Sequence, residues 1–578
     1  MLKLIKYLRD YIKETIIGPL FKLFEACFEL IVPLVMASII DKGIKNNDTA
    51  YILKMGGIMI LLGILGLVCS ITAQYFAAKA ALGFGTALRN EMFSHINSLS
   101  FSEIDKIGTA SLITRITSDI NQAQTGVNLV LRLFLRSPFI VAGAIIMALF
   151  INVKLTLIFL AVTLLISLII YFIMSSSIPH YRNVQGKLDK VSLIARENLT
   201  GVRVIRAFSR QKDEVSRFEK STNDLTGTQL MVGKISALLN PATYSILNAG
   251  IIAVMYFGSF TVYEGTISQG ELIALINYMS QILLALLALA NLIIAFTRAS
   301  ASAIRINEVF AVTSTMKENG DDLSKGVKKS PKVEFKNVSF SYGLSEEEAI
   351  SDISFEARNG ETIGIIGGTG SGKSTLINLI PRFYDTTSGE VIIDGINVKD
   401  YLFSELREKI AVVPQKAVLF RGSIRENIKW GKKDATDEEI YKALEIAQAK
   451  EFVDEKPDGL DTEIMQGGKN LSGGQRQRLT IARALVAQPE ILILDDSASA
   501  LDFATDARLR KAIMTQTKKM TIFIVSQRAS AIKNADKIIV LDDGKMVGIG
   551  KHDELLETCE IYKEICLSQL SEDEVKSK

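Results

Sequence analysis

Apolar residues dominate the chain up to about residue 310, where six stretches are each long enough to cross a bilayer. A transmembrane helix needs about 20 predominantly apolar residues. The stretches occupy residues 15–40, 51–78, 129–151, 155–175, 244–264 and 270–296. The pattern therefore predicts an all-α polytopic membrane domain with six transmembrane helices.

Two connections between these stretches are long, and they are helical in pattern but too polar to stay in lipid. We expect residues 79–128 and 176–243 to prolong membrane helices into the cytosol and to turn around short helices near 102–109 and 200–224. Segment 176–243 carries eleven Lys and Arg residues, whereas the three short loops hold only Lys42, Lys45 and Lys154. Because positively charged loops tend to remain in the cytosol, both termini and both long loops are predicted to be cytoplasmic.

The pattern changes after residue 311. A polar linker by composition is followed by strands that alternate with helices, which is typical of an α/β domain. The cationic and apolar residues of segment 1–13 lie at helical spacing and predict an interfacial helix rather than a signal peptide. The expected parts are a membrane domain (1–311), a linker (312–331), an α/β domain (332–569) and a charged tail (570–578).

Composition agrees with an apolar part joined to a soluble part, because 48% of residues are hydrophobic while 22% are charged. The net charge is only +3, which gives no general excess for binding nucleic acid, and six spans argue against a soluble nucleic-acid-binding protein. The four cysteines have no metal-ligand spacing and are expected to be reduced thiols.

A glycine-rich loop between a strand and a helix is the clearest site for chemistry. The strand Ile363–Gly367 runs into a complete G-x-x-x-x-G-K-S motif, in which backbone N–H groups can surround phosphate oxygens. Lys373 is expected to reach the β- and γ-phosphates, and the hydroxyl of Ser374 to bind Mg²⁺. The candidate nucleotide ligands in this loop are Gly367, Gly368, Thr369, Gly370, Ser371, Gly372, Lys373, Ser374 and Thr375.

A second strand, Ile491–Leu494, leads to two adjacent acids, Asp495 and Asp496. An acid at the end of such a strand supplies a second contact to the Mg²⁺ of a bound nucleotide, and we assign this role to Asp495. Between the two motifs lies the sequence Leu-Ser-Gly-Gly-Gln-Arg-Gln-Arg, residues 471–478.

This last motif is the signature sequence of ABC ATPases, and the whole chain up to about residue 569 resembles a half-transporter of the ABC exporter type. The resemblance implies a type I exporter fold followed by a P-loop ATPase domain. It implies that Ser472, Gly473, Gly474 and Gln475 contact the ATP that is bound at the phosphate loop of a partner domain. In the membrane half, residues 197–208 and 298–309 resemble the cytoplasmic passages of exporters.

The resemblance also gives roles to residues that would be ambiguous alone. Tyr342 could be an edge-strand aromatic, but its place some 25 residues before the phosphate loop favours stacking on adenine. Gln415 could be a solvated loop residue, but it resembles the Gln that links Mg²⁺ and the attacking water to the membrane domain. Residues 499–502 resemble the D-loop, and Trp430, the only tryptophan, is expected to be structural.

The sequence departs from the family pattern at the hydrolytic positions. Asp496 stands where the family usually has the Glu that polarises the attacking water. Because Asp is one methylene shorter, its carboxylate is expected to lie too far back, and a displacement of about 1 Å can reduce the rate on the order of a hundredfold. Gln527 stands where the family has a His, and Gln can donate a hydrogen bond but cannot carry a positive charge. Gln466 also replaces a frequent Glu before the signature. None of the three histidines falls at the switch position by sequence.

These departures predict one half of a heterodimeric exporter. Its own phosphate loop would build a degenerate site that mostly holds ATP, while its intact signature would complete the hydrolytic site of a different half-transporter. The expected function is ATP-driven efflux of drug-like amphiphiles across the plasma or inner membrane, with ATP and Mg²⁺ as cofactors. Alternatives are chance drift to inactivity, a homodimeric exporter of lipid or peptide, and an ATP-gated channel or regulatory protein.

Charged residues also occur within the predicted spans. Glu25 and Glu29 share one face of the first span, and Arg132 and Arg136 share one face of the third. Because charges inside membranes tend to face the bundle interior or each other, we expect pairing between the spans. Substrate contact and an interfacial position are the alternatives.

Overall fold

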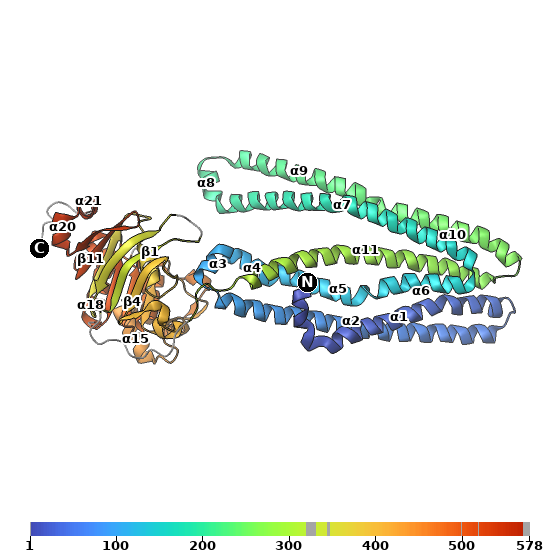
Figure 1. Cartoon of the computed structure of the whole chain (residues 1–578), viewed down its shortest axis with the longest axis horizontal. Coiled ribbons are helices and arrows are strands. Elements are labelled where there is room, and N and C mark those ends of the chain that lie inside the picture. The colour runs from blue at the N-terminus through green and yellow to red at the C-terminus, as the bar shows by residue number, and fades with distance from the viewer. Residues whose placement is uncertain (1, 319–330, 344–346, 499, 518, 570–578) are drawn as a thin grey trace. The chain divides into compact units, whose positions relative to one another are not determined.

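The structure is a computed structural model that describes residues 2–318, 331–343, 347–498, 500–517 and 519–569. Its contacts divide the chain into two units. The helical unit contains Met1–Asn97 and Ala110–Val312, and the α/β unit contains Ser98–Thr109 and Thr313–Lys578 (Figure 1). Most of the expected linker and the whole expected tail lie outside the described residues.

The helical unit consists of long helices joined by short turns. Two of its segments, η2 and η3, are turns of π-helix, and η1 is a 3-10 helix at the interfacial segment expected from the sequence. The elements are η1 (Leu2–Tyr11), α1 (Ile12–Ser38), η2 (Ile39–Ile44), α2 (Thr49–Ser98), α4 (Thr109–Thr114), η3 (Arg115–Asp119), α5 (Ile120–Leu133), α6 (Arg136–Ile151), α7 (Val153–Thr200), α8 (Val202–Ala207), α9 (Gln211–Ala237), α10 (Leu239–Tyr263) and α11 (Gln269–Ala311).

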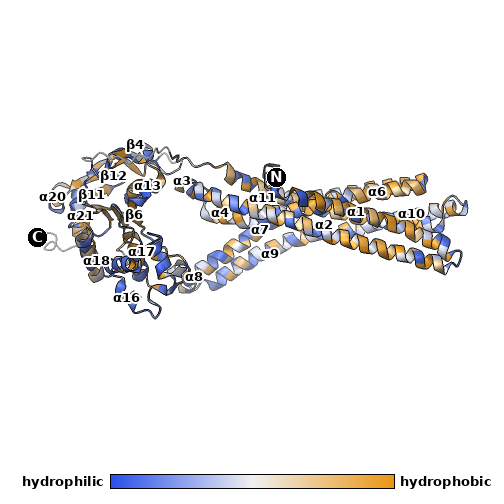
Figure 2. Cartoon of the chain, turned by 90° about the horizontal axis from the view of Figure 1, so that it is seen from below, coloured by the Kyte–Doolittle hydropathy of each residue, from blue (hydrophilic) through white to orange (hydrophobic). Residues whose placement is uncertain are grey.

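Six helical segments among the described residues are long and apolar enough to span a membrane, which confirms the six predicted spans. Apolar residues cover much of α1, α2 and α6 (Figure 2). Helix α11 packs against α1, α5, α6 and α10 and so forms the centre of the unit. Close packing of α1 on α2 uses small residues, since a Cβ on Gly18 would lie 3.3 Å from the backbone nitrogen of Ala77.

The third span is interrupted where the apolar pattern predicted one helix. Helix α5 ends at Leu133 and α6 begins at Arg136. Pro138 explains the break, because it has no N–H to donate to the carbonyl of Phe134 and its ring crowds that carbonyl.

One side chain fastens the end of α1 to the start of α11. Asp41, in η2, accepts hydrogen bonds from the hydroxyl of Ser268 and from the N–H of Gly270, the latter at 2.9 Å. A Cβ on Gly270 would lie 2.3 Å from the carbonyl oxygen of Ala37. The approach of the two helices therefore requires glycine at position 270.

The α/β unit contains the short helix α3 and all elements after α11. Helices α3 and α8 occur close to the two places where the sequence predicted short helices. The elements of this unit are α3 (Phe101–Ile107), β1 (Val333–Phe340), β2 (Ile350–Ala357), β3 (Thr362–Gly367), α12 (Lys373–Leu379), β4 (Ser388–Ile393), β5 (Ile396–Asn397), η4 (Val398–Asp400), α13 (Phe403–Glu408), β6 (Ile410–Val413), β7 (Gly422–Ser423), α14 (Ile424–Lys429), α15 (Asp437–Ile446), α16 (Lys450–Asp454), η5 (Gly459–Asp461), β8 (Glu463–Ile464), η6 (Gln466–Gly468), α17 (Gly473–Leu485), β9 (Ile491–Asp495), α18 (Phe503–Gln516), β10 (Thr521–Val525), α19 (Ala529–Ile532), β11 (Lys537–Asp542), β12 (Lys545–Gly550), α20 (His552–Thr558) and α21 (Glu560–Gln569).

Two larger sheets organise this unit, and β7 pairs with β8 in a third, two-stranded sheet. A six-stranded sheet has the order β12-β11-β3-β10-β9-β6, and its pairs are parallel except for β11 with β12. A four-stranded antiparallel sheet has the order β2-β1-β4-β5. Strands β3, β9 and β10 are buried along their whole length. Because they are central and parallel, the loops after their carboxyl ends meet at one edge, where ligands bind in such sheets.

The assignment of residues 98–109 differs from the boundary predicted from sequence. Helix α3 packs on the α/β unit through Phe101, whose ring centre lies 4.9 Å from that of Phe383. The hydroxyl of Tyr384 also donates to Asp105 at 2.7 Å. These contacts arise from side chains far apart in sequence, so the apolar pattern could not show them.

Candidate functional site

The phosphate loop connects β3 to α12 with the conformation that its glycines allow. Gly370 and Gly372 have φ values of +85° and +90°, which residues with a Cβ rarely adopt. A Cβ on Gly367 would lie 2.1 Å from the carbonyl oxygen of Leu541. The backbone can therefore turn its N–H groups inward, as binding of phosphate requires.

Lys373 is buried at the start of α12 and points back into the loop. Its ammonium donates to the carbonyl oxygens of Gly367, at 3.0 Å, and of Gly368. Burial lowers the pKa of Lys373, while the charges of Asp495 and Asp496 oppose that shift. The ammonium is thus held in place by weak acceptors, which an anionic phosphate can replace.

The two residues predicted to hold Mg²⁺ meet in this structure. The hydroxyl of Ser374 donates to Oδ1 of Asp495 at 3.1 Å. Burial raises the pKa of Asp495, although the hydrogen bond from Ser374 acts in the opposite direction. A hydroxyl and a buried carboxylate side by side are oxygen ligands of the kind that Mg²⁺ uses beside nucleotide phosphates, so these residues fit the ion.

Asp496 follows directly and has a left-handed backbone, with φ +43°. The side-chain amide of Gln415 donates to its Oδ2 at 3.4 Å, a long hydrogen bond. Burial raises the pKa of Asp496, while the hydrogen bond from Gln415 and the charge of Arg528 lower it. The influence of Arg528 was not predicted, although a basic residue beside the switch position was visible in the sequence.

These residues line one pocket of about 330 Å³. The pocket brings together most of the predicted nucleotide residues with Ala349, Val525 and Ser526, which the sequence did not single out. Gly367, Gly368 and Ser371 belong to the same loop but do not line the pocket. The predicted residues that line it are Tyr342, Thr369, Gly370, Gly372, Lys373, Ser374, Thr375, Gln415, Asp495, Asp496 and Gln527.

Tyr342 lies over the start of α12. Its hydroxyl is 3.1 Å from the hydroxyl of Thr375, and its ring meets Phe340 and Tyr384 edge-on, at 4.8 and 5.3 Å between centroids. The side chain is 43% exposed, which leaves part of the ring accessible from the pocket. Stacking on adenine remains a prediction for this residue.

The signature residues form a separate feature. Ser472 caps α17, since its hydroxyl accepts from the N–H of Gln475 at 3.2 Å and the side chain of Gln475 accepts from the N–H of Ser472 at 3.0 Å. Among the described residues that line the phosphate-loop pocket, none comes from segment 472–475. Ser499, in the segment resembling the D-loop, lies outside the described residues. Trp430 is 67% exposed and stacks on Phe420.

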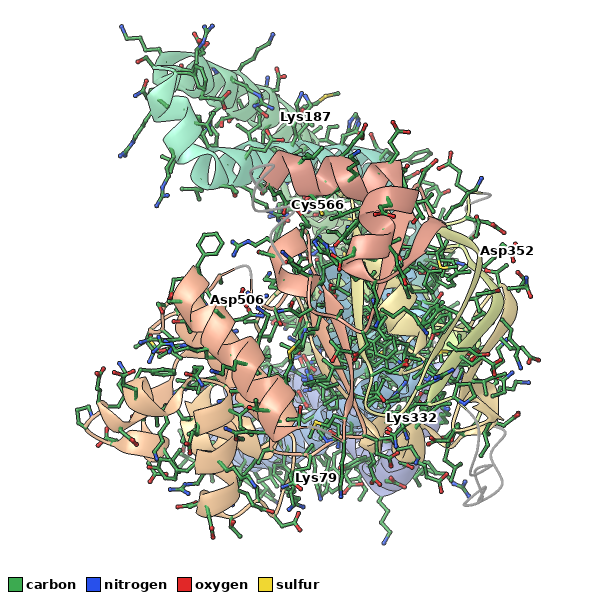
Figure 3. All side chains as sticks on the ribbon, turned by 90° about the vertical axis from the view of Figure 1, so that its left-hand side faces the viewer. Lys79, Lys187, Lys332, Asp352, Asp506 and Cys566 are labelled. Carbon is green, nitrogen blue, oxygen red and sulfur yellow. The ribbon has the colours of Figure 1, made fainter. Side chains whose placement is uncertain are left out.

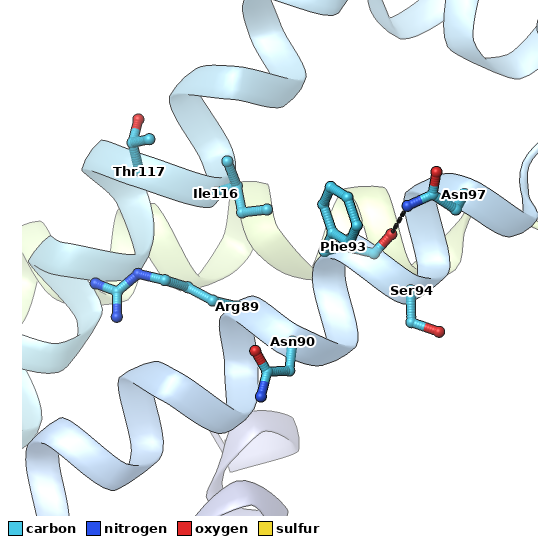
Figure 4. Close-up of a pocket in the computed structure, with 7 residues that line it drawn as sticks. All are labelled: Arg89, Asn90, Phe93, Ser94, Asn97, Ile116 and Thr117. Carbon is cyan, nitrogen blue, oxygen red and sulfur yellow. Dashed lines mark hydrogen bonds between the residues drawn. The ribbon is translucent and has the colours of Figure 1, made fainter. Parts of the chain in front are cut away.

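A larger pocket of about 690 Å³ lies in the helical unit between α2 and the α4–η3 segment (Figure 4). Asn90, Phe93 and Thr117 are among the residues that line it. Arg89 is the charged residue that lines this pocket, and its guanidinium donates to the side chain of Asn121. The described residues that line this pocket include no glycine loop and no carboxylate comparable to those of the phosphate-loop site.

The charged residues of the spans do pair, although not all of them. Arg136 donates to Glu29 at 2.7 Å and lies 3.9 Å from Glu25, which joins α6 to α1. Glu25 is also paired with Lys22 on its own helix. Nε of Arg132 is buried and has no hydrogen-bond partner among the described residues. Pairing between the spans thus involves Arg136, and the sequence had not identified Lys22.

Comparisons with known proteins agree with this arrangement. A family model for the ABC transporter transmembrane region matches residues 15–286, and one for the ABC transporter matches residues 350–499. The chain is 38% identical over 576 residues to the uncharacterized ABC transporter ATP-binding protein YfiB of Bacillus subtilis strain 168, covering 99% of both proteins. It is 32% identical to the ATP-dependent lipid A-core flippase of Hahella chejuensis, covering 89% of this chain and 88% of that protein.

The fold is also similar to that of a solved structure, a bacterial Atm1-family ABC exporter with ATP bound. The TM-score is 0.79 with 23% sequence identity, and the match covers 99% of each chain. Two family models matched in order, six spans and an ATPase site in one polypeptide lead to a single assignment. The chain belongs to the ABC transporter family, as an exporter half-transporter with its transmembrane and ATP-binding domains joined.

Proposed function

We propose that this ATP-driven transporter works as one half of a heterodimer and holds ATP at a site that hydrolyses it poorly. The observation that carries the proposal is that Asp496 and Gln527 line the same pocket as the phosphate loop. The carboxylate that would orient the attacking water is short, and the group beside the γ-phosphate position has no imidazole. In this one pocket, the two residue types that support fast hydrolysis are therefore both replaced by less effective ones.

The intact signature supports a division of work between two different halves. The capped start of α17 is well formed, although segment 472–475 lies outside the chain's own phosphate-loop pocket. A partner's phosphate loop would meet this segment, and the partner would supply the missing Glu and His. ATP binding would bring the two ATPase domains together and turn the membrane halves outward, and hydrolysis at the partner's site would reset them.

For the cargo, we propose an amphiphilic small molecule that crosses the plasma or inner membrane outward.

Within the pocket of the ATPase domain, Ser374 and Asp495 would hold Mg²⁺, whose charge would offset that of the phosphates. A homodimeric lipid exporter is the second candidate, and it is favoured by the relatives named as lipid A-core flippases.

The test is ATP hydrolysis by the full chain in lipid nanodiscs, alone and co-expressed with half-transporters that have Glu and His at the positions of Asp496 and Gln527. We expect slow hydrolysis alone and a large increase with the correct partner. Hydrolysis at ordinary exporter rates by the chain alone would contradict the proposal and favour a homodimer.

Vesicles containing the active pair then decide between a pump and an ATP-gated channel, because only a pump concentrates an amphiphilic dye against its gradient.

A substitution in the signature identifies which site hydrolyses ATP. Ser472→Ala should reduce hydrolysis by the pair about tenfold or more if the signature stabilises transition-state charge there. Thr436→Ala is the matched control, because Thr436 caps α15 with the same type of capping box outside the signature. Equal effects of the two variants would show that only helix capping was lost.

A further inference from the structure

The loop after β10, which carries Gln527, is held by a side chain from the end of α21. The amide Nε2 of Gln569 donates to the carbonyl oxygen of Gln527 at 2.7 Å. Its Oε1 accepts from the N–H of Ala529 at 2.9 Å. One amide thus bridges the backbone on both sides of Arg528, and a donor facing an acceptor at each end fixes the orientation of the amide.

The bridge comes from a well-anchored support. Tyr562 and Cys566, on the same helix as Gln569, are fully buried, and Tyr562 is hydrogen-bonded to Nδ1 of His552 at 2.7 Å. Helix α21 also packs on α19, the helix that the loop leads into. Cys566 is labelled in Figure 3. Because the helix is fixed by its buried face, its last turn can hold the loop at a set position.

Other contacts hold the residues on either side of Gln527: the N–H of Ser526 donates to the carbonyl of Ile365, and the guanidinium of Arg528 lies over the ring of Phe503. Gln527 is exposed and follows the last residue of β10 by two positions, while α19 begins only at Ala529. The N–H of Arg528 bonds to the hydroxyl of Ser526 at 3.0 Å, which orients the start of the loop. The bonds from Gln569 act directly on the carbonyl of Gln527 and on the N–H of Ala529.

We propose that Gln569 is a positioning residue for ATP binding, which holds the backbone of Gln527 so that its side chain faces the γ-phosphate position. The inference rests on the role proposed above for Gln527. A glutamine has three side-chain torsions to order, so its placement benefits strongly from a fixed backbone. Gln569 would therefore favour ATP over ADP without touching either nucleotide.

The test measures the affinities of the full chain for MgATP and MgADP by equilibrium dialysis with labelled nucleotides. Losing the bridge removes one or two net hydrogen bonds that order the loop, so Gln569→Ala should weaken MgATP binding about three- to tenfold. MgADP binding should stay within about twofold, since ADP has no γ-phosphate.

Gln569→Glu should also weaken MgATP binding, because it places a carboxylate against the carbonyl of Gln527. Ser568→Ala is the matched control, since within the described part of the chain the hydroxyl of Ser568 bonds to Ile565 of its own helix, so the variant should change neither affinity.

A double-mutant cycle with Gln527→Ala separates positioning from a general structural role. In the Gln527→Ala background, Gln569→Ala should cause no further loss of MgATP affinity. An equal loss for MgATP and MgADP, an additive loss in the cycle, or no loss would each overturn the positioning role. If Gln527→Ala alone leaves the ratio of the two affinities unchanged, the proposed role of Gln527 fails, and the role of Gln569 fails with it.

Discussion

Asp496 combines a short side chain with a backbone conformation that few residues adopt. Its φ of +43° lies in the left-handed region, where Asp and Asn occur several-fold more often than other residues with a Cβ. The backbone therefore suits aspartate, while the length of the side chain limits its reach toward an attacking water. The same position can favour Asp for folding and disfavour it for catalysis.

Lengthening this side chain should increase turnover at some cost in stability. Asp496→Glu should raise the ATP turnover of the chain alone about tenfold or more, because a gain of about 1 Å in reach restores alignment of the water. The left-handed backbone should cost the variant about 1 kcal/mol of folding free energy. Turnover is measured with the full chain in nanodiscs. Asp496→Asn is the isosteric control and should abolish the remaining activity, whereas an unchanged rate in Asp496→Glu would show that reach does not limit hydrolysis.

Residues close together in sequence were the easiest to predict at this site. The phosphate loop could be read directly, and the acid that follows the short strand, Asp495, lies beside Ser374. No sequence pattern points to Gln569, an exposed amide whose contacts depend on how α21 packs. The left-handed backbone of Asp496 is likewise set by the turn after β9 and not by a glycine.

At the scale of elements, a charged cluster joins the two larger sheets of the ATPase domain. Lys332, before β1, is 6% exposed and bonds to Asp394 at 2.8 Å and to Glu490. Lys409 bonds to the same two acids, at 3.3 and 3.1 Å. The turn after β4 and the approaches to β1, β6 and β9 are thereby connected. Lys332 is labelled in Figure 3.

This cluster should make stability depend on pH. Burial would raise the pKa of Glu490, but the hydrogen bonds and charges of Lys332 and Lys409 outweigh it and lower the pKa overall. A lowered folded-state pKa gives stability that is present above the ordinary carboxyl range and is lost as the pH falls through the lowered value. Thermal unfolding, followed by the fluorescence of Trp430, should show a midpoint that falls on acidification and falls less in Glu490→Gln.

Removing the buried cation tests the same cluster at neutral pH. Lys332→Met should lower the free energy of unfolding by about 2 kcal/mol, since two acids lose a charged donor. Lys336→Met is the matched control, because Lys336 is half exposed and pairs with Glu334 at 3.1 Å. Exposed pairs of this kind contribute about 1 kcal/mol or less. Equal shifts in the two variants would contradict a special role for Lys332.

A second charged contact joins α1 to α6 within the membrane half. Arg136→Gln should lower the thermal stability of the purified transporter, because Glu29 would lose its partner at 2.7 Å. The double variant Glu29→Gln with Arg136→Gln should recover part of the loss, since leaving one charge of a pair unpartnered within a span costs more than replacing both members. Arg132→Gln serves as the control and should have a smaller effect. A double variant less stable than Arg136→Gln would argue that the glutamate has another role.

The boundaries of elements show where the apolar pattern was sufficient and where it was not. The six spans were predictable because each needs a long apolar stretch. The break before α6 required the proline rule for Pro138, and the π-helical turn at residues 115–119 has no pattern that announces it. The choice of Arg136 over Arg132 as the partner of Glu29 depends on side-chain direction, which periodicity alone does not give.

For the whole molecule, the distribution of charge predicts which side of the membrane each loop faces. A membrane-impermeant maleimide should label Lys45→Cys in intact cells, whereas Arg210→Cys should require permeabilised cells. Both positions are exposed. Three of the four native cysteines are buried and Cys27 is half-buried, so the native chain provides a low-background control. Labelling of Arg210→Cys in intact cells would reverse the predicted orientation.

The contact of Asp41 with Ser268 and Gly270 has a mechanical consequence for the transport cycle. It fastens the first and last spans together at one end, so those ends act as a shared pivot. A rearrangement that separates α1 from α11 would then be largest at their opposite ends, and it would meet the bonds from Tyr278 to Leu30 and from Gln281 to Glu29 before it reached Asp41. A lever of this kind would convert a modest rotation of the long helices into a wide movement far from the pivot, while the pivot itself stays closed.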